Sequence, residues 1–189
     1  MSILNENHVT FEEFKKMEDN SEHILEYIDG FVFMAASPSI KHQRISSILQ
    51  GELYLLLKNN KKCNVFSAPT DVILQNEDTD DTRKVVPDIF VTCNKDGFTK
   101  NEYKGTPDLI IEIVSPSNQA HDLVTKLNLY MKHRVKEYWI VNPLLNNVMI
   151  YSLDEKNEYH LNVIPDDSLA QSVLFTAFKI NTRELFEEI

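Results

Sequence analysis

One glutamate interrupts an otherwise apolar segment of the chain. Glu112 is the only polar residue in the sequence Leu-Ile-Ile-Glu-Ile-Val at positions 109–114. Such a segment is typical of a central strand that is covered on both faces. A carboxylate among apolar neighbours is costly unless a cation lies beside it or it stays protonated. The segment therefore predicts a functional carboxylate with a positive partner; the alternatives are an ordinary buried ion pair or a wetter edge strand.

A second acid stands where another strand is expected to begin. Asp88 follows Pro87 and precedes the apolar sequence Ile-Phe-Val at positions 89–91. Mg²⁺ prefers oxygen ligands and commonly takes one or two carboxylates together with water and substrate phosphate. Asp88 and Glu112 on neighbouring strands can meet that demand, so both are predicted metal ligands. The alternative for Asp88 is a turn residue at the start of its strand.

Lys126 is the candidate cation for these acids. Asp122, Lys126 and Tyr130 are four residues apart and share one face of a predicted helix. From that face Lys126 can reach back along the edge of the sheet toward the carboxylates. The alternative is an exposed ion pair between Lys126 and Asp122, which contributes little to stability. The functional prediction depends on the convergence of Asp88, Glu112 and Lys126.

The overall composition fits one globular domain over residues 1–189, but the charge does not favour nucleic acid. The chain is 42% hydrophobic and 25% charged, with a formal net charge of −10. A strongly acidic protein repels phosphate backbones, which favours weak or selective nucleic-acid binding or another function. Part of the acid lies at positions 76–81, Asn-Glu-Asp-Thr-Asp-Asp, which predict a solvated loop.

Two further features of the sequence bear on the cellular location of the protein. Neither a long apolar segment nor a charged leader is found, so we expect no membrane span, no signal peptide and a cytoplasmic protein. Cys63 and Cys93 lack the spacing of a zinc site or a redox motif. Two free apolar thiols are the expectation for a reduced compartment, with a disulfide or zinc role as the less favoured alternative.

Turn signals and apolar periodicity predict the elements that position these residues. Thr10 and Glu13 form a capping box for an N-terminal helix, and Asp29-Gly30 predicts a β-hairpin over 24–36 that carries Glu26. Helices are also predicted over 41–58, from about 117 to 133, and from position 182. Strands are predicted at 65–67, 71–74, 85–92, 109–114, 138–141, 148–153 and 172–179. We therefore expect an α/β fold with a mixed central sheet flanked by helices.

Several segments together resemble the Uma family of restriction endonucleases. The resemblance rests on Pro87-Asp88, on Ile-Glu-Ile-Val-Ser-Pro-Ser at 111–117, on Asp122, Lys126 and Tyr130, and on Glu-Tyr-Trp-Ile-Val-Asn-Pro at 137–143. Segments 25–30, 42–45 and 68–72 also match, so the resemblance covers positions 10–186. Each motif alone is weak, but their combination is highly specific. Asn142 departs from the family pattern, which has Asp there.

This family is placed in the PD-(D/E)XK nuclease superfamily, and the resemblance implies a restriction-endonuclease-like fold. It implies hydrolysis of phosphodiester bonds, with Asp88 and Glu112 binding Mg²⁺, or Mn²⁺ as a substitute. Lys126 would take the place of the superfamily lysine, and Glu26 matches an additional acid of the site. The resemblance also suggests DNA as the nucleic-acid partner and a homodimer.

Three functions stay open on the sequence: an endonuclease acting on DNA, a nuclease acting on RNA or small nucleotides, and a catalytically silent module that binds a partner. The net charge favours the silent module, and the presence of both acids and the lysine favours an enzyme. His42 and Arg44 are candidate substrate contacts, although a core-edge or capping role is the favoured alternative for His42. His121 is expected to face solvent, and Tyr130 and Tyr138 are expected to be core residues.

Overall fold

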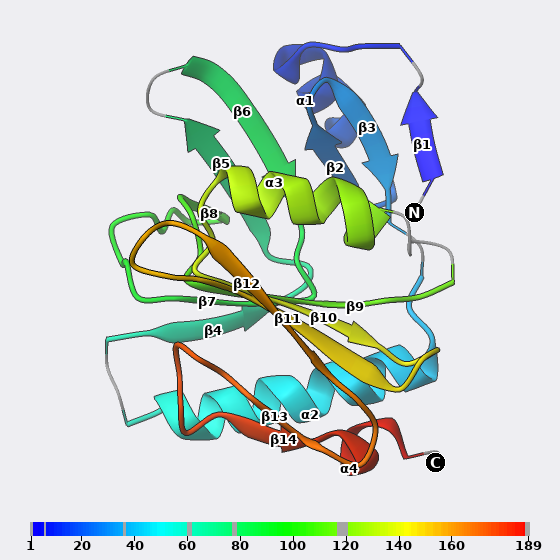
Figure 1. Ribbon diagram of the computed structural model, residues 1–189. Helices are drawn as coiled ribbons and strands as arrows, with labels where there is room; N and C mark the ends of the chain where they lie inside the picture. The colour runs from blue at the N-terminus through cyan, green and yellow to red at the C-terminus, as the bar shows by residue number, and fades with distance from the viewer. Residues whose placement is uncertain are drawn as a thin grey trace.

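The computed structural model describes residues 2–5, 7–35, 37–59, 62–76, 79–116 and 121–187 (Figure 1). Its strands are β1 (Ser2–Asn5), β2 (Leu25–Ile28), β3 (Phe31–Met34), β4 (Asn64–Ser67), β5 (Asp71–Asn76), β6 (Thr79–Val85), β7 (Ile89–Thr92), β8 (Glu102–Lys104), β9 (Leu109–Ile113), β10 (Glu137–Asn142), β11 (Asn147–Leu153), β12 (Tyr159–Ile164), β13 (Leu169–Gln171) and β14 (Lys179–Asn181). Its helices are α1 (Phe11–Asp19), α2 (Ile40–Leu57), the π-helical turn η1 (His121–Lys126), α3 (Leu127–Lys132) and α4 (Thr182–Phe186).

A mixed central sheet carries the strands on which the candidate acids were predicted. Its six strands are ordered β12-β11-β10-β9-β7-β4. Strands β9 and β10 are parallel, and the other neighbours are antiparallel. Helices α2 and α4 cover one face of this sheet, and α3 lies over the other (Figure 1). The predicted fold class, a mixed sheet flanked by helices, is confirmed.

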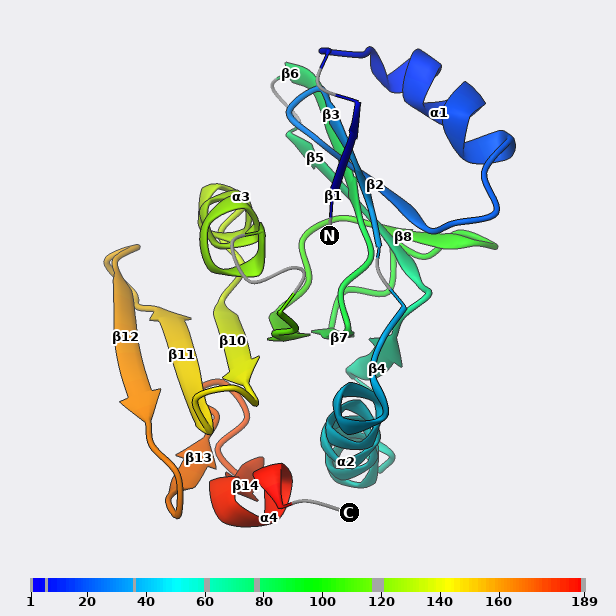
Figure 2. The ribbon, with the colours of Figure 1, turned by 90° about the vertical axis from the view of Figure 1, so that its right-hand side faces the viewer.

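The N-terminal hairpin belongs to a second sheet of six strands, here called the outer sheet, with the order β1-β3-β2-β6-β5-β8. Asp29 and Gly30 form the turn between β2 and β3 with φ angles of 50° and 84°, the left-handed region that such turns require. The capping box of Thr10 and Glu13 begins α1 as predicted. Helix α1 covers the face of the outer sheet that points away from α3 (Figure 2).

The alternation of side chains along β9 decides where Glu112 points. Ile111 and Ile113 belong to the core formed with α2 and α4. Ile110 and Val114 belong to the core shared by α3 and the outer sheet. Because side chains alternate along a strand, Glu112 lies on the same face as Ile110 and Val114. Its carboxylate is therefore directed into the space between the central sheet, the outer sheet and α3.

Several predicted elements differ from the structure. The strand predicted over 85–92 is two strands, β6 and β7, which belong to different sheets, and residues 172–178 form a turn between β13 and β14. Strands β8 and β12 were not predicted. Residues 79–81 of the predicted acidic loop belong to β6, while Glu77 and Asp78 lie outside the described residues. The helix start predicted near Ser117 also lies outside them, and the description resumes at His121.

The prediction of two free thiols is wrong, because Cys63 and Cys93 form a disulfide bond. The cause is the antiparallel register of β4 and β7, which places Asn64 opposite Thr92 and therefore brings the adjoining cysteines together. Sequence spacing alone does not reveal which strands pair. Among the described helices, none is both long and apolar enough to cross a membrane.

Candidate active site

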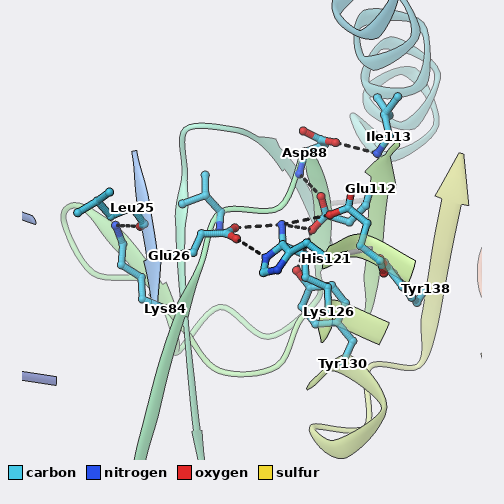
Figure 3. A network of polar contacts seen from close by, with 12 residues as sticks. Leu25, Glu26, Lys84, Asp88, Glu112, Ile113, His121, Lys126, Tyr130 and Tyr138 are labelled. Atoms are coloured by element: carbon cyan, nitrogen blue, oxygen red, sulfur yellow. Dashed lines mark hydrogen bonds and ion pairs between the residues drawn. The ribbon is translucent and has the colours of Figure 1, made fainter. Parts of the chain in front are cut away.

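Three predicted residues converge between the central sheet and the outer sheet, and Glu26 joins them from the outer sheet. The backbone N–H of Asp88 donates to Glu112 Oε2 at 3.4 Å, across the antiparallel pair β7 and β9. Lys126 ends η1, and its Nζ lies 2.9 Å from Glu112 Oε1 and 3.0 Å from Glu26 Oε1. Figure 3 shows Lys126 between the two glutamates. The predicted acids and the predicted lysine therefore form one cluster.

Glu112 is held mainly through one of its two oxygens. Its Oε1 accepts a hydrogen bond from Lys126 and another, at 2.8 Å, from the hydroxyl of Tyr130. The side chain is almost completely buried. Burial raises the pKa of the Glu112 carboxyl above its usual range; the charges of Asp88 and Glu26 add to the rise, and Lys126 opposes it. Its Oε2 faces the backbone N–H of Asp88, and the Asp88 carboxyl group is close enough to contribute to the pKa of Glu112.

Asp88 is fixed by the central sheet and by α2. Its Oδ2 accepts the backbone N–H of Ile113 at 2.7 Å and lies 3.1 Å from His42 Nε2. His42 stands in the first turn of α2, where Ser39 caps the helix by accepting its backbone N–H. Burial would lower the pKa of His42, but the charges of Asp88 and Glu112 raise it overall. His42 therefore lies in the capped first turn of α2, and its ring also contacts Asp88, a predicted metal ligand.

Glu26 is a buried anion with several donors around it. Its Oε1 accepts the backbone N–H of Val86 at 2.7 Å, and its Oε2 lies 3.2 Å from His121 Nε2. Burial would raise the pKa of this carboxyl, but Lys126, His121 and the Val86 amide hold it at about 2. His121 was predicted to face solvent, and that prediction is wrong: it is buried, with its ring 4.3 Å from that of Phe33. The cause is η1, which turns this residue toward the outer sheet.

The π-helical turn η1 presents both Asp122 and Lys126 to the interior. Asp122 is fully buried, its Oδ1 lies 4.0 Å from Lys126 Nζ, and neither carboxyl oxygen has a hydrogen-bond partner within the described part of the chain. Burial raises the pKa of Asp122 above its usual range. The hydroxyl of Tyr138 donates to the backbone carbonyl of Asp122 at 3.1 Å, which ties η1 to β10. Single-turn π-helices are frequent at functional sites.

The carboxyl groups of the cluster outnumber its permanent cation. Four acids surround one lysine; they are Glu26, Asp88, Glu112 and Asp122, with Lys126 between them. An excess of negative charge in a buried place is unfavourable and is relieved either by protonation or by a bound cation. The cluster therefore has the electrostatic character of a cation site.

A pocket of about 260 Å³ opens onto the cluster. Asp88, Glu112, Lys126 and His42 contribute polar groups to its lining. The lining also includes apolar residues, which are Ile24, Ala35, Pro38, Ala68, Pro69 and Val86. A small molecule or part of a larger one can thus reach the two acids and the lysine from solvent.

Arg44 and Asn142 do not line the pocket. Arg44, a candidate substrate contact, donates from its guanidinium to the backbone carbonyls of Leu185 and Glu184 at 3.1 and 3.3 Å. It therefore joins α2 to α4 and is not brought to the pocket. Asn142, where the family pattern has Asp, accepts the backbone N–H of Leu144 at 3.0 Å, so the contact in the turn after β10 is made.

Sequence reasoning missed the roles of two aromatic residues and one histidine. Tyr130 and Tyr138 are core residues as expected, but their hydroxyls also bind Glu112 and the Asp122 carbonyl. The spacing of Tyr130 four residues after Lys126 was the available signal, because it places both on the face that meets Glu112. No comparable signal existed for His121, whose partner Glu26 is 95 residues away in sequence.

A solved structure and a family model match this chain over most of its length. A crystal structure titled as a "putative nuclease belonging to DUF820", from Anabaena variabilis, superposes with a TM-score of 0.76 and 22% sequence identity, covering 94% of this chain and 97% of that one. The model of the Uma2 family, described as "Putative restriction endonuclease", matches residues 11–183, and the chain belongs to this family. "Uncharacterized protein slr1290" from Synechocystis is 24% identical over 172 residues, 90% of this chain and 88% of that protein.

Proposed function

We propose that this chain is a metal-dependent endonuclease that hydrolyses phosphodiester bonds, with DNA as its substrate. The observation that carries the proposal is the meeting of Asp88, Glu112 and Lys126 at one pocket. These residue types can bind a hard cation, hold a phosphate and stabilise its charge during hydrolysis. Membership of a family described as restriction endonucleases supports the same reaction.

The residues fit a divalent cation such as Mg²⁺, with Mn²⁺ as a substitute. Asp88 and Glu112 both offer carboxyl oxygens to the pocket that they line, and the cluster carries more carboxyl groups than permanent cations. When bound there, Mg²⁺ supplies Lewis acidity toward a phosphate oxygen and an attacking water. Asp88 and Glu112 would hold the ion.

Four other side chains of the cluster stabilise charge or hold the metal-binding acids and the lysine in place. Lys126 lies at the pocket wall, where its ammonium can orient the attacking water or stabilise the additional negative charge of the transition state. Tyr130 fixes the Oε1 side of Glu112, which directs Oε2 toward Asp88. Glu26 anchors the lysine from the opposite side, and His42 fixes the orientation of Asp88. Glu26 and His42 are therefore positioning residues.

The test is a titration of Mg²⁺ and Mn²⁺ with single- and double-stranded DNA and RNA. Wild-type protein is compared with Glu112→Gln and Lys126→Ala, and matched controls are Glu158→Gln and Lys156→Ala in the exposed turn between β11 and β12. We expect metal-dependent cleavage by the wild type and by both controls. The two site variants should lose about 10²-fold or more, as removal of one transition-state contact typically does.

Two outcomes would contradict the proposal. Unchanged cleavage in Glu112→Gln and Lys126→Ala would place the chemistry elsewhere. Absence of both cleavage and metal binding would favour a silent binding module, for which the net charge of −10 is the motivating observation. The homodimer, which would bring two sites to two strands, stays a prediction that light scattering can test.

A further inference from the structure

The lining of the pocket at the acid cluster includes apolar residues that the hydrolysis of a phosphate does not use. Ile24 precedes β2, Ala35 follows β3, and Pro69 lies in the turn between β4 and β5, yet all three line the same pocket. Ile24 keeps 41% of its surface exposed, so an apolar side chain lies at a solvent-accessible site. Apolar surface of this kind is stabilised when a ligand covers it. A bare phosphate, which is fully polar, cannot cover it.

The positive charge at the pocket is too small for a site that binds a duplex through its backbone. Among the described residues that line the pocket, His42 and Lys126 are the basic ones, and both face acids. Arg44, two residues after His42 on α2, is bound to the end of α4. Proteins that hold duplex DNA typically contact about 6–10 phosphates. Affinity at this pocket must therefore come largely from the part of the substrate that is attached to the phosphate group.

A nucleobase has the chemistry that matches the pocket. Its faces are apolar, and its edges carry hydrogen-bond donors and acceptors. Gln43, whose side chain is exposed on α2, lines the pocket beside the apolar residues, and a glutamine amide can pair with the edge of a base. In a stacked duplex the faces of the bases are hidden, so only an unpaired or rotated base can enter such a pocket.

We propose that this pocket binds the base of the nucleotide next to the scissile phosphate, and that the substrate is nucleic acid in which this base is unpaired. The assignment rests on the proposed function, because the acids define where the phosphate lies. Ile24 supplies apolar contact to the base, and Gln43 contributes to the choice of base. The preference for single strands also agrees with a net charge of −10, since fewer phosphates approach the protein.

The binding test uses the Glu112→Gln protein, which should neither bind the metal nor cleave, with fluorescent DNA oligonucleotides, and measures binding by anisotropy. The probes are a single strand, the matching duplex, and the same strand with abasic residues at its central positions. We expect the single strand to bind about tenfold tighter than either of the others, as base contacts of this size allow. Equal or tighter binding of the duplex or of the abasic strand would overturn the inference.

Matched variants localise the effect to the pocket. Ile24→Ala should weaken single-strand binding about fivefold through lost apolar contact. Ile40→Ala, at an isoleucine of α2 that is 78% exposed and outside the pocket, should not. Gln43→Ala should change the preference among homopolymer strands, whereas Gln50→Ala on the same helix should not. Equal effects of Ile24→Ala and Ile40→Ala would overturn the assignment.

Cleavage assays separate this inference from the proposed function. Cleavage of duplex and single strand at equal rates, with no effect of Ile24→Ala, would leave the nuclease intact and reject the base pocket. Base-dependent binding without cleavage by the wild-type protein would keep the pocket and reject the nuclease. Absence of any nucleic-acid binding would reject both.

Discussion

Two lysines of this chain are almost completely buried, and their surroundings differ. Lys84 on β6 pairs with Glu18 on α1 and lies 2.9 Å from Asp71 on β5. Lys126 on η1 lies 2.9 and 3.0 Å from two glutamates of different sheets. Burial would lower the pKa of both ammonium groups, but their acid partners raise both instead. The charge and the burial of the lysine alone therefore do not distinguish the candidate active site around Lys126 from the structural ion pairs of Lys84.

The acids around the lysines make the difference. The side chains of Glu18 and Asp71 are 22% and 29% exposed, so water screens part of their negative charge. The ion pairs with Lys84 compensate the part that water does not screen. Around Lys126 the partner carboxylates are at most 3% exposed, and further acids lie behind them. Lys84 therefore joins α1 to the outer sheet, whereas Lys126 stands in a cluster with more carboxyl groups than permanent cations. The excess of buried carboxylate marks the candidate site.

The largest effect is expected from Lys126→Met. Removal of the cation leaves buried carboxylates without compensation, which should cost about 4 kcal/mol of stability. Cleavage per folded molecule should fall about 10³-fold, because no other permanent cation of the described cluster reaches the pocket. Thermal melting and single-turnover cleavage measure the two effects separately. Retained cleavage would show that Lys126 resembles Lys84 and serves stability alone.

Lys84→Met is the matched variant at the other lysine. It leaves Asp71 without its lysine and Glu18 with Lys15 as its remaining partner, and both acids are partly hydrated, so the expected loss is about 2 kcal/mol of stability. Cleavage per folded molecule should stay close to that of the wild type, because neither acid lines the pocket. Urea denaturation and cleavage below the melting temperature provide the measurements. A large loss of activity in the folded variant would remove the distinction drawn between the two lysines.

The sequence was sufficient to predict the centre of the cluster for identifiable reasons. Glu112 stands out because its neighbours are apolar, and the i,i+4 spacing places Lys126 and Tyr130 on the face that meets it. The alternation in β9 fixes which way Glu112 points. These are short-range patterns, and they persist whatever the rest of the chain does. The predicted mixed sheet follows from the same local signals.

The remaining features depend on contacts between distant segments. His42 meets Asp88 across 46 residues, and His121 meets Glu26 across 95. The disulfide of Cys63 and Cys93 needs the register of β4 and β7. A local pattern also does not show that the hairpin belongs to a second sheet. The burial of His121 was therefore predicted wrongly, even though the elements that cause it, the hairpin and the helix, were largely predicted.

Tyr130→Phe tests the cluster around Lys126 in a second way, because it removes one hydrogen bond of the cluster and leaves its charges unchanged. The variant loses the 2.8 Å hydrogen bond to Glu112 Oε1, and a bond to a charged group is worth about 1.5 kcal/mol. We expect cleavage to fall about tenfold, with a higher Mg²⁺ concentration needed for half-maximal rate, because Glu112 is less firmly oriented. Tyr159→Phe, which loses a hydroxyl bond to the Val135 carbonyl, is the control and should retain both values.

The smallest effect is expected at a group of two acids and one histidine, which lies at the exposed turn between β11 and β12 and at the start of β12. The ligand atoms of Asp154, Glu158 and His160 lie within 4.8 Å of one another, which is a geometry that could hold an ion. His160 is 62% exposed, and the hydrogen bond from His160 lowers the pKa of Asp154, so this group is satisfied by hydrogen bonds and water rather than by burial near a lysine. Asp154→Asn should leave metal-dependent cleavage and calorimetric Mg²⁺ binding unchanged, while Glu112→Gln abolishes both. If Asp154→Asn removes the metal-binding event and Glu112→Gln does not, then proximity of ligand atoms, and not buried excess charge, selects the cation site in this chain.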